Sequence, residues 1–177
     1  MRGEKKVSNT QDSTIFPETN GKKLIFLDKE ALLARLSNTR STEKEDIVHR
    51  FFYLSRNQGF YYTDIYVMAE VFSTVSSKAS TREAAKLRSD ILTSSIEVRH
   101  GSDNWKKENL TKSPKNVFLA AAEALEERGK IDCKLPEATL ILQAAAAGAD
   151  YVFSYDEAVR KFSASFGVAT LPYRKTW

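Results

Sequence analysis

The chain has 177 residues, about one domain, of which 42% are hydrophobic and 28% are charged. Lys and Arg number 27 against 23 Asp and Glu, and this net charge of +4 permits a nucleic-acid partner without requiring one. Cys133 is the single cysteine, which excludes an intrachain disulfide and a cysteine-based metal centre. The two histidines, His49 and His100, are too few for a histidine-rich zinc site. The composition therefore narrows polar chemistry to carboxylates, hydroxyls and basic side chains, and leaves carboxylates as the plausible metal ligands.

The first 22 residues are polar, and we expect them to form a flexible tail before a single domain over residues 23–177. Residues 1–23 hold five Lys and Arg against three Asp and Glu, so about half of the positive charge belongs to this tail. We expect no secretory signal and no membrane-spanning segment, because no apolar run approaches the ~20 residues that a membrane helix needs. The lone cysteine suits a reducing, cytoplasmic setting.

Short apolar segments alternate with helical patterns along the chain. In the first half of the chain we expect a strand at 23–28, a helix at 29–37, a helix after the capping box Thr42–Glu45, a strand at 60–63, and helices at 65–77 and 80–93. In the second half we expect a strand at 95–99, helices at 114–129 and 136–148, and a strand at 149–154. A helix capped by Asp156 and ending at Gly167 then precedes an edge strand at 168–172. This alternation is typical of an α/β fold with a mainly parallel sheet, whose ligands bind beyond the carboxyl ends of the strands.

Two aspartates end buried strands and begin helices. Asp28 follows KLIFL, and Asp156 follows the strand segment YVFSY. Either residue can be a helix N-cap or a carboxylate at the edge of a cleft. Two such strands in one parallel sheet would bring both carboxylates to the same edge, which favours a functional site.

Two glutamates lie in helical segments where an isolated charge is unusual. The predicted apolar stripe of the helix that contains Glu70 consists of Ile65, Met68, Phe72 and Val75. Glu70 points away from that stripe on an otherwise uncharged polar face, either as a solvated residue or in a cleft wall. Glu137 opens the uncharged run ATLILQAAAAGA, where it either stabilises a helix N-terminus or is held at the rim of the core. Clustered carboxylates stay ionised when a cation offsets their repulsion, and hard oxygen ligands favour Mg²⁺ or Mn²⁺.

The order of these four acids resembles that of PIN domains, the metal-dependent nuclease domains of VapC-type toxins. The resemblance covers residues 23–177 and rests on the segments LIFLD, VMAEVF, LPEATLILQAAAAGADYVFSYDEAV and GVATLP. It implies a three-layer α/β/α sandwich with a central, mainly parallel sheet, a homodimer, and a metal site formed by Asp28, Glu70, Glu137 and Asp156.

The resemblance also implies an activity: hydrolysis of RNA phosphodiester bonds with Mg²⁺ or Mn²⁺, without a covalent intermediate on the protein. Asp28 and Asp156 would bind the metal directly. Glu70 and Glu137 would bind through water, complete a second metal site or orient the attacking water. For a toxin it further implies an antitoxin that inserts a peptide into the acidic cleft.

The chain departs from the PIN pattern at two positions. The first Asp of the family is usually followed by Thr or Ser, whereas Lys29 and Glu30 follow Asp28 here. The third acid is usually Asp, and Glu137 is one methylene longer; Glu30 and Asp132 are candidate substitutes.

These departures keep a second interpretation open, in which a PIN-like domain binds RNA or protein without cleaving and the Lys29 ammonium takes the place of the cation. A phosphatase of the haloacid dehalogenase type is disfavoured because its D-x-D motif is absent. Basic residues that either contact phosphates or form ordinary solvated surface are Lys78, Arg82, Lys86, Lys106, Lys107, Lys112 and Lys115.

Overall fold

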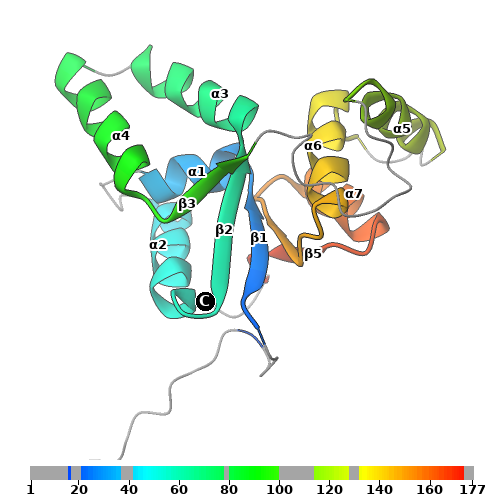
Figure 1. Cartoon of the computed structure of the whole chain (residues 1–177), viewed down its shortest axis with the longest axis horizontal. Coiled ribbons are helices and arrows are strands. Elements are labelled where there is room, and N and C mark those ends of the chain that lie inside the picture. Colours follow the sequence, from blue (N-terminus) through cyan, green and yellow to red (C-terminus); the bar gives the residue numbers. More distant parts are fainter. Residues whose placement is uncertain are drawn as a thin grey trace, which may run out of the picture.

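Figure 1 presents a computed structural model of the chain, which describes residue 16 and residues 21–36, 42–77, 80–99, 114–127 and 132–173. Within these residues five strands form one sheet in the order β3-β2-β1-β4-β5, and all four strand pairings are parallel. The strands are β1 (Lys23–Leu27), β2 (Gly59–Asp64), β3 (Ile96–Arg99), β4 (Tyr151–Phe153) and β5 (Ala169–Leu171). The expected parallel sheet, with its last strand at one edge, is confirmed.

Helices cover both faces of this sheet. They are α1 (Lys29–Leu36), α2 (Glu43–Ser55), α3 (Ile65–Ser76), α4 (Thr81–Thr93), α5 (Pro114–Glu127), α6 (Leu135–Ala146) and α7 (Glu157–Ser165). In Figure 1, α1 to α4 lie on one side of the strands and α5 to α7 on the other. Helix α1 packs against α2 and α3, and α6 packs against α5 and α7. The architecture is the expected three-layer α/β/α sandwich.

Local signals in the sequence fix several helix ends. Thr42 and Glu45 form the predicted capping box at the start of α2: the Glu45 N–H donates to the Thr42 hydroxyl over 3.2 Å, and the Thr42 N–H donates to the Glu45 carboxylate over 3.0 Å. Gly148 and Gly167 follow α6 and α7 with φ angles of 78° and 73°, a left-handed conformation that favours glycine. The ends of these helices are therefore encoded locally.

Aromatic side chains dominate the core between α2 and the sheet. Phe51 of α2 and Phe153 of β4 are fully buried, with their ring centroids 5.0 Å apart. Phe16, which lies within the predicted tail, is also buried and packs on Tyr151 of β4 at a centroid distance of 5.0 Å. Burial of rings this large supplies a major part of the hydrophobic stabilisation.

The buried face of α3 differs from its predicted stripe, and α2 also leaves apolar residues partly exposed. On α2, Val48, Phe51, Phe52 and Ser55 are buried, whereas Ile47 and Leu54 are only partly buried. On α3, Val67, Met68 and Val71 are buried, while Ile65 is 45% exposed. Helix α3 begins directly after β2 with Asp64 as its N-cap, so the end of the strand sets which face meets α1. Ile65 is therefore left exposed, although it is hydrophobic, because tertiary contacts fix the orientation of α3.

None of the helices within the described ranges is long and apolar enough to cross a membrane. Residues 1–15 and 17–20 lie outside those ranges, so the tail over residues 1–22 remains a prediction.

Candidate active site

Asp28 and Asp156 come together at the carboxyl edge of the sheet. Strands β1 and β4 are parallel neighbours, with Leu27 opposite Phe153. Beyond the strands the two segments stay side by side, because the Asp28 N–H donates to the Phe153 carbonyl oxygen over 3.2 Å. The Asp156 charge is near enough to Asp28 to raise its pKa. The expected meeting of these two carboxylates at one edge is therefore seen.

Asp28 occupies a partly buried position before α1. Burial raises its carboxyl pKa from 3.8 to about 6, and the nearby charges of Glu30 and Asp156 act in the same direction. Two hydrogen bonds oppose this rise in pKa: the Ala31 N–H donates to Oδ1 of Asp28 over 2.8 Å, and the Ser154 hydroxyl also bonds the carboxylate. Asp28 thus caps α1, and the folded structure also makes its carboxyl group harder to ionise.

Asp156 is more exposed and caps α7. Its Oδ1 accepts hydrogen bonds from the N–H groups of Ala158 at 2.8 Å and Val159 at 3.2 Å. Its own N–H donates to the Ser154 hydroxyl oxygen over 3.1 Å. For both Asp28 and Asp156, the capping role and the cleft-edge position hold at the same time.

Ser154 links the two aspartates, and the sequence did not single it out as a site residue. Its side chain is fully buried, its hydroxyl oxygen accepts from the Asp156 N–H, and its hydroxyl bonds the Asp28 carboxylate. A hydroxyl has one proton to donate, so this geometry directs that proton to Asp28. The available signal was a polar residue directly after the buried strand YVF.

Glu137 lies in the first turn of α6 with its side chain partly buried. Its Oε2 atom is buried and, within the described part of the chain, has no hydrogen-bond partner. An unsatisfied buried carboxylate oxygen is unfavourable unless a further group binds it. Glu137 therefore lies both at a helix N-terminus and at the rim of the core, so the two alternatives that the sequence left open are compatible.

Cys133 connects Glu137 electrostatically to the rest of the site. Burial raises the pKa of the Cys133 thiol to about 11, and the charges of Glu137, Asp156 and Asp132 add to that rise. The thiol thus lies within electrostatic reach of acids from the start of α6 and from the β4–α7 connection. Asp132 itself is exposed.

Glu70 forms an ion pair with a basic residue of α1. Its side chain is 58% exposed on α3 and pairs with the ammonium of Lys29, the residue that follows Asp28. The other candidate substitute, Glu30, pairs with Lys44 at 2.9 Å. The structure thus brings Asp28 and Asp156 together, leaves Glu137 and Asp156 each within electrostatic reach of Cys133, and pairs Glu70 with Lys29.

The four acids form no ready-made cation site. Among the residues that the structure describes, no group of three or more His, Cys, Asp or Glu side chains is arranged as metal ligands. Carboxylate oxygens nevertheless suit a hard divalent cation. A cation could bind the Glu137 oxygen that has no hydrogen-bond partner, and its positive charge would lower the raised pKa of Asp28.

Of the basic residues singled out from the sequence, the structure describes the side chains of Arg82 and Lys86 alone. Arg82 and Lys86 are exposed on α4. The remaining positions lie outside the described residues or have side chains that the structure does not describe: Lys78, Lys106, Lys107, Lys112 and Lys115.

No family model and no curated protein matches the sequence. Solved structures do match the fold. The chain resembles VapC20 of Mycobacterium tuberculosis, a sarcin-ricin loop cleaving toxin, with 17% identity, a TM-score of 0.54, and coverage of 80% of this chain and 94% of that one.

Two further structures give higher TM-scores. VapBC2 of Rickettsia felis, bound to a DNA fragment from its promoter, matches with 17% identity, a TM-score of 0.60, and coverage of 84% of this chain and 97% of that one. FitAcB of Neisseria gonorrhoeae matches with 13% identity, a TM-score of 0.58, and coverage of 84% and 96%. Such identities establish the fold alone. The chain has the fold of a VapC-type PIN domain, as its motifs predicted.

Proposed function

We propose that this protein is a metal-dependent endoribonuclease that hydrolyses RNA phosphodiester bonds. The observation that carries the proposal is the Asp28–Asp156 pair at the carboxyl edge of a VapC-type sheet, since this is where α/β folds bind their ligands. VapC20, which shares the fold, is a toxin that cleaves the sarcin-ricin loop.

Asp28 and Asp156 would hold Mg²⁺ or Mn²⁺ directly, and Glu137 and Glu70 would complete the set through water, in a second metal site or by orienting the attacking water. When bound, the divalent ion would lower the pKa of a water molecule and stabilise charge on the scissile phosphate. The chain's own contribution is positional. Ser154 orients the Asp28 carboxylate, and the N-cap bonds of Asp156 fix its Oδ1.

We further propose a toxin that acts in the cytoplasm as a homodimer and has an antitoxin partner. The support is the likeness to VapC20, described as a toxin, and to VapBC2 bound to promoter DNA. A neighbouring small open reading frame that encodes a DNA-binding protein is the expected genomic companion, and co-expression of the two should yield a stable complex.

The nuclease proposal is tested by RNA cleavage in the presence of Mg²⁺ or Mn²⁺. We expect Asp28→Asn and Asp156→Asn each to lower the cleavage rate by about a hundredfold or more, because each removes a carboxylate from the metal set. Unchanged cleavage in both variants would overturn the assignment of the site.

The Lys29–Glu70 ion pair favours a second candidate function, a PIN-like module that binds RNA or protein without cleaving it. In that case the Lys29 ammonium takes the place of the cation, as its contact with Glu70 suggests. Metal titration separates the two functions. A nuclease should bind Mn²⁺ in a manner that Asp28→Asn abolishes, whereas a binding module should retain RNA affinity with no Mn²⁺ binding at this edge.

A further inference from the structure

A second candidate site lies at the opposite edge of the sheet from Asp28. It is a cavity of about 310 Å³, and its lining residues are Arg35, His49, Phe52, Tyr53, Arg56, Tyr61 and Ser95. This volume is at the lower end of the range for small-ligand pockets, which suits a group the size of one nucleotide.

The elements that build the cavity place it away from the acids. Arg35 is in the last turn of α1, whereas Asp28 precedes the first turn, so the two ends are about 10 Å apart along the helix. Ser95 comes just before β3, at the amino end of that strand. A ligand in this cavity would not occupy the carboxylate edge.

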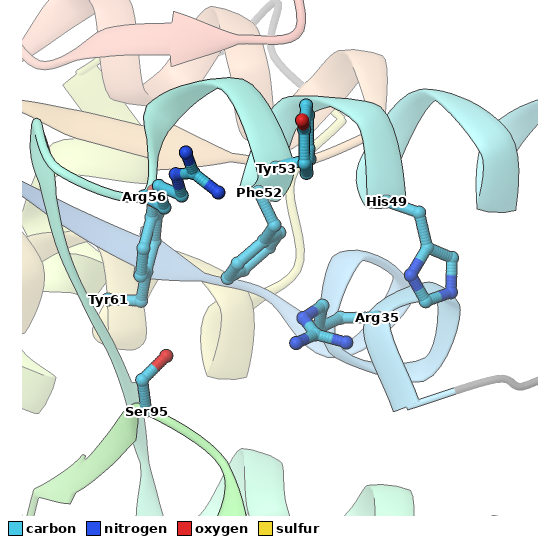
Figure 2. Close-up of a pocket in the computed structure, with 7 residues that line it drawn as sticks. All are labelled: Arg35, His49, Phe52, Tyr53, Arg56, Tyr61 and Ser95. Atoms are coloured by element: carbon cyan, nitrogen blue, oxygen red, sulfur yellow. The ribbon is translucent and has the colours of Figure 1, made fainter.

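One face of α2 supplies most of the wall. His49, Phe52, Tyr53 and Arg56 are spaced i, i+3, i+4 and i+7, which places them on one side of the helix. Figure 2 shows Phe52 between Tyr61 of β2 and Arg35 of α1. The Phe52 and Tyr61 ring centroids are 4.3 Å apart, and the Arg35 guanidinium lies 5.0 Å from the Phe52 centroid.

The electrostatic character of the wall is positive. Arg35 and Arg56 each carry a permanent charge, His49 adds a titratable group, and none of the described lining residues is acidic. Burial raises the pKa of Tyr61, so its hydroxyl stays neutral at physiological pH. The cavity therefore suits an anion.

The aromatic side chains that line the cavity indicate which class of anion it would bind. The Arg56 guanidinium lies 5.2 Å from the centroid of Tyr53, whose side chain is 66% exposed. Exposed aromatic and guanidinium planes stack on nucleobases, and arginines bind phosphates. An acidic peptide would use the charge but would have no particular need of these planes.

We propose that this cavity holds one unstacked nucleotide of a single-stranded RNA, with Arg35 and Arg56 at its phosphates. The inference rests on the proposed RNA substrate and adds a recognition site at a distance from the cleavage site. The strand would then reach from the cavity along α1 toward Asp28.

The test measures RNA binding by the full-length protein in EDTA, where metal-dependent cleavage is absent. A labelled single-stranded RNA of mixed sequence is titrated at several salt concentrations. For each arginine lost, the slope of log K against log salt should become less negative by about 0.7. The dissociation constant should rise about tenfold for Arg35→Ala/Arg56→Ala.

Matched variants separate charge, planarity and folding. Arg50→Ala removes an exposed charge from the same helix outside the cavity and should keep the wild-type slope. Arg56→Lys should keep the slope but weaken binding, because the charge remains and the stacking plane is lost. Arg35 packs on Phe52, so the double variant can misfold. In that case the single variant Arg56→Ala, at an exposed position, provides the test.

The outcomes also separate this proposal from the nuclease proposal. RNA binding that depends on Arg56, without cleavage in either Mg²⁺ or Mn²⁺, would support the cavity and overturn the nuclease. Cleavage together with wild-type RNA binding by Arg56→Ala would overturn the cavity and leave the nuclease standing. A third outcome would also overturn the proposed RNA contact. In it, Arg56→Ala loses binding to a nucleoside monophosphate or an acidic peptide but still binds RNA.

Discussion

The Lys29 ammonium forms an ion pair with the Glu70 carboxylate, although the two residues are 41 positions apart. Lys29 directly follows Asp28 in the chain, so the residue after the first acid of the proposed site supplies the positive charge that pairs with the second. A cation supplied by the chain itself offsets repulsion among the carboxylates, as a metal ion would. If Glu70 belongs to a metal site, the Lys29 ammonium competes with the metal ion for its carboxylate.

Replacing Lys29 by Met should increase the affinity for Mn²⁺ by about tenfold, because the substitution releases Glu70 and removes a competing charge. The free energy of unfolding should change by less than about 1 kcal/mol, since both partners are substantially exposed. Isothermal titration with Mn²⁺ measures the affinity and the stoichiometry. Lys86→Met, at an exposed position on α4, is the control and should leave both unchanged. Equal Mn²⁺ affinity in wild type and Lys29→Met would contradict the competing role of the ammonium.

The raised pKa of Asp28 makes stability depend on pH. Between about pH 4 and pH 6 the folded protein keeps a proton on Asp28 that the unfolded chain has released, so the contribution of Asp28 to the free energy of unfolding falls as the pH rises. Asp28→Asn is neutral throughout and should raise the free energy of unfolding at about pH 7.5 by up to about 3 kcal/mol, with little change at about pH 4.

Urea denaturation of the metal-free protein at both pH values checks this expectation. Asn retains an oxygen that can accept the Ala31 N–H, so the cap of α1 is preserved. A stability gain of equal size at both pH values would mean that ionisation of Asp28 is not its cause.

The order of the elements and the meeting of Asp28 with Asp156 could be predicted from the sequence because both depend on local signals. Short apolar strands, the Thr42–Glu45 capping box and the glycines after α6 and α7 mark the element ends. Parallel topology then brings Asp28 and Asp156 to one edge.

Features that depend on tertiary contacts could not be predicted in this way. The Lys29–Glu70 pair joins α1 to α3, and no spacing rule relates residues so far apart. The buried faces of α2 and α3 are selected by the neighbours they pack against, so Ile65 is exposed despite its hydrophobicity. Ser154 gains its role only when β4 lies beside β1, because its partner Asp28 comes from the other strand.

Glu137→Gln should lower the pKa of the Cys133 thiol from about 11, because one of the negative charges that raise it is removed. It should also weaken Mn²⁺ binding, since a carboxylate with a buried, unpartnered oxygen is lost. Cys133 is the chain's single cysteine, so the pH dependence of thiol alkylation reports on it alone. Glu97→Gln, on β3, is the control. An unchanged thiol pKa in Glu137→Gln would place Glu137 outside electrostatic reach of the site.

Ser154→Ala should raise the pKa of Asp28 further, because it removes a hydrogen bond that favours the ionised carboxylate. Mn²⁺ binding should then require a higher pH, and its affinity near neutral pH should fall by about tenfold. The matched control is Ser163→Ala: Ser163 is equally buried, but its hydroxyl donates to the Val159 carbonyl oxygen within α7 over 2.8 Å. Both variants lose a buried hydroxyl and should lose similar stability, on the order of 1 kcal/mol. Only Ser154→Ala should shift the pH profile of Mn²⁺ binding, so equal shifts in the two variants would show that Ser154 supports the fold rather than the Asp28 carboxylate.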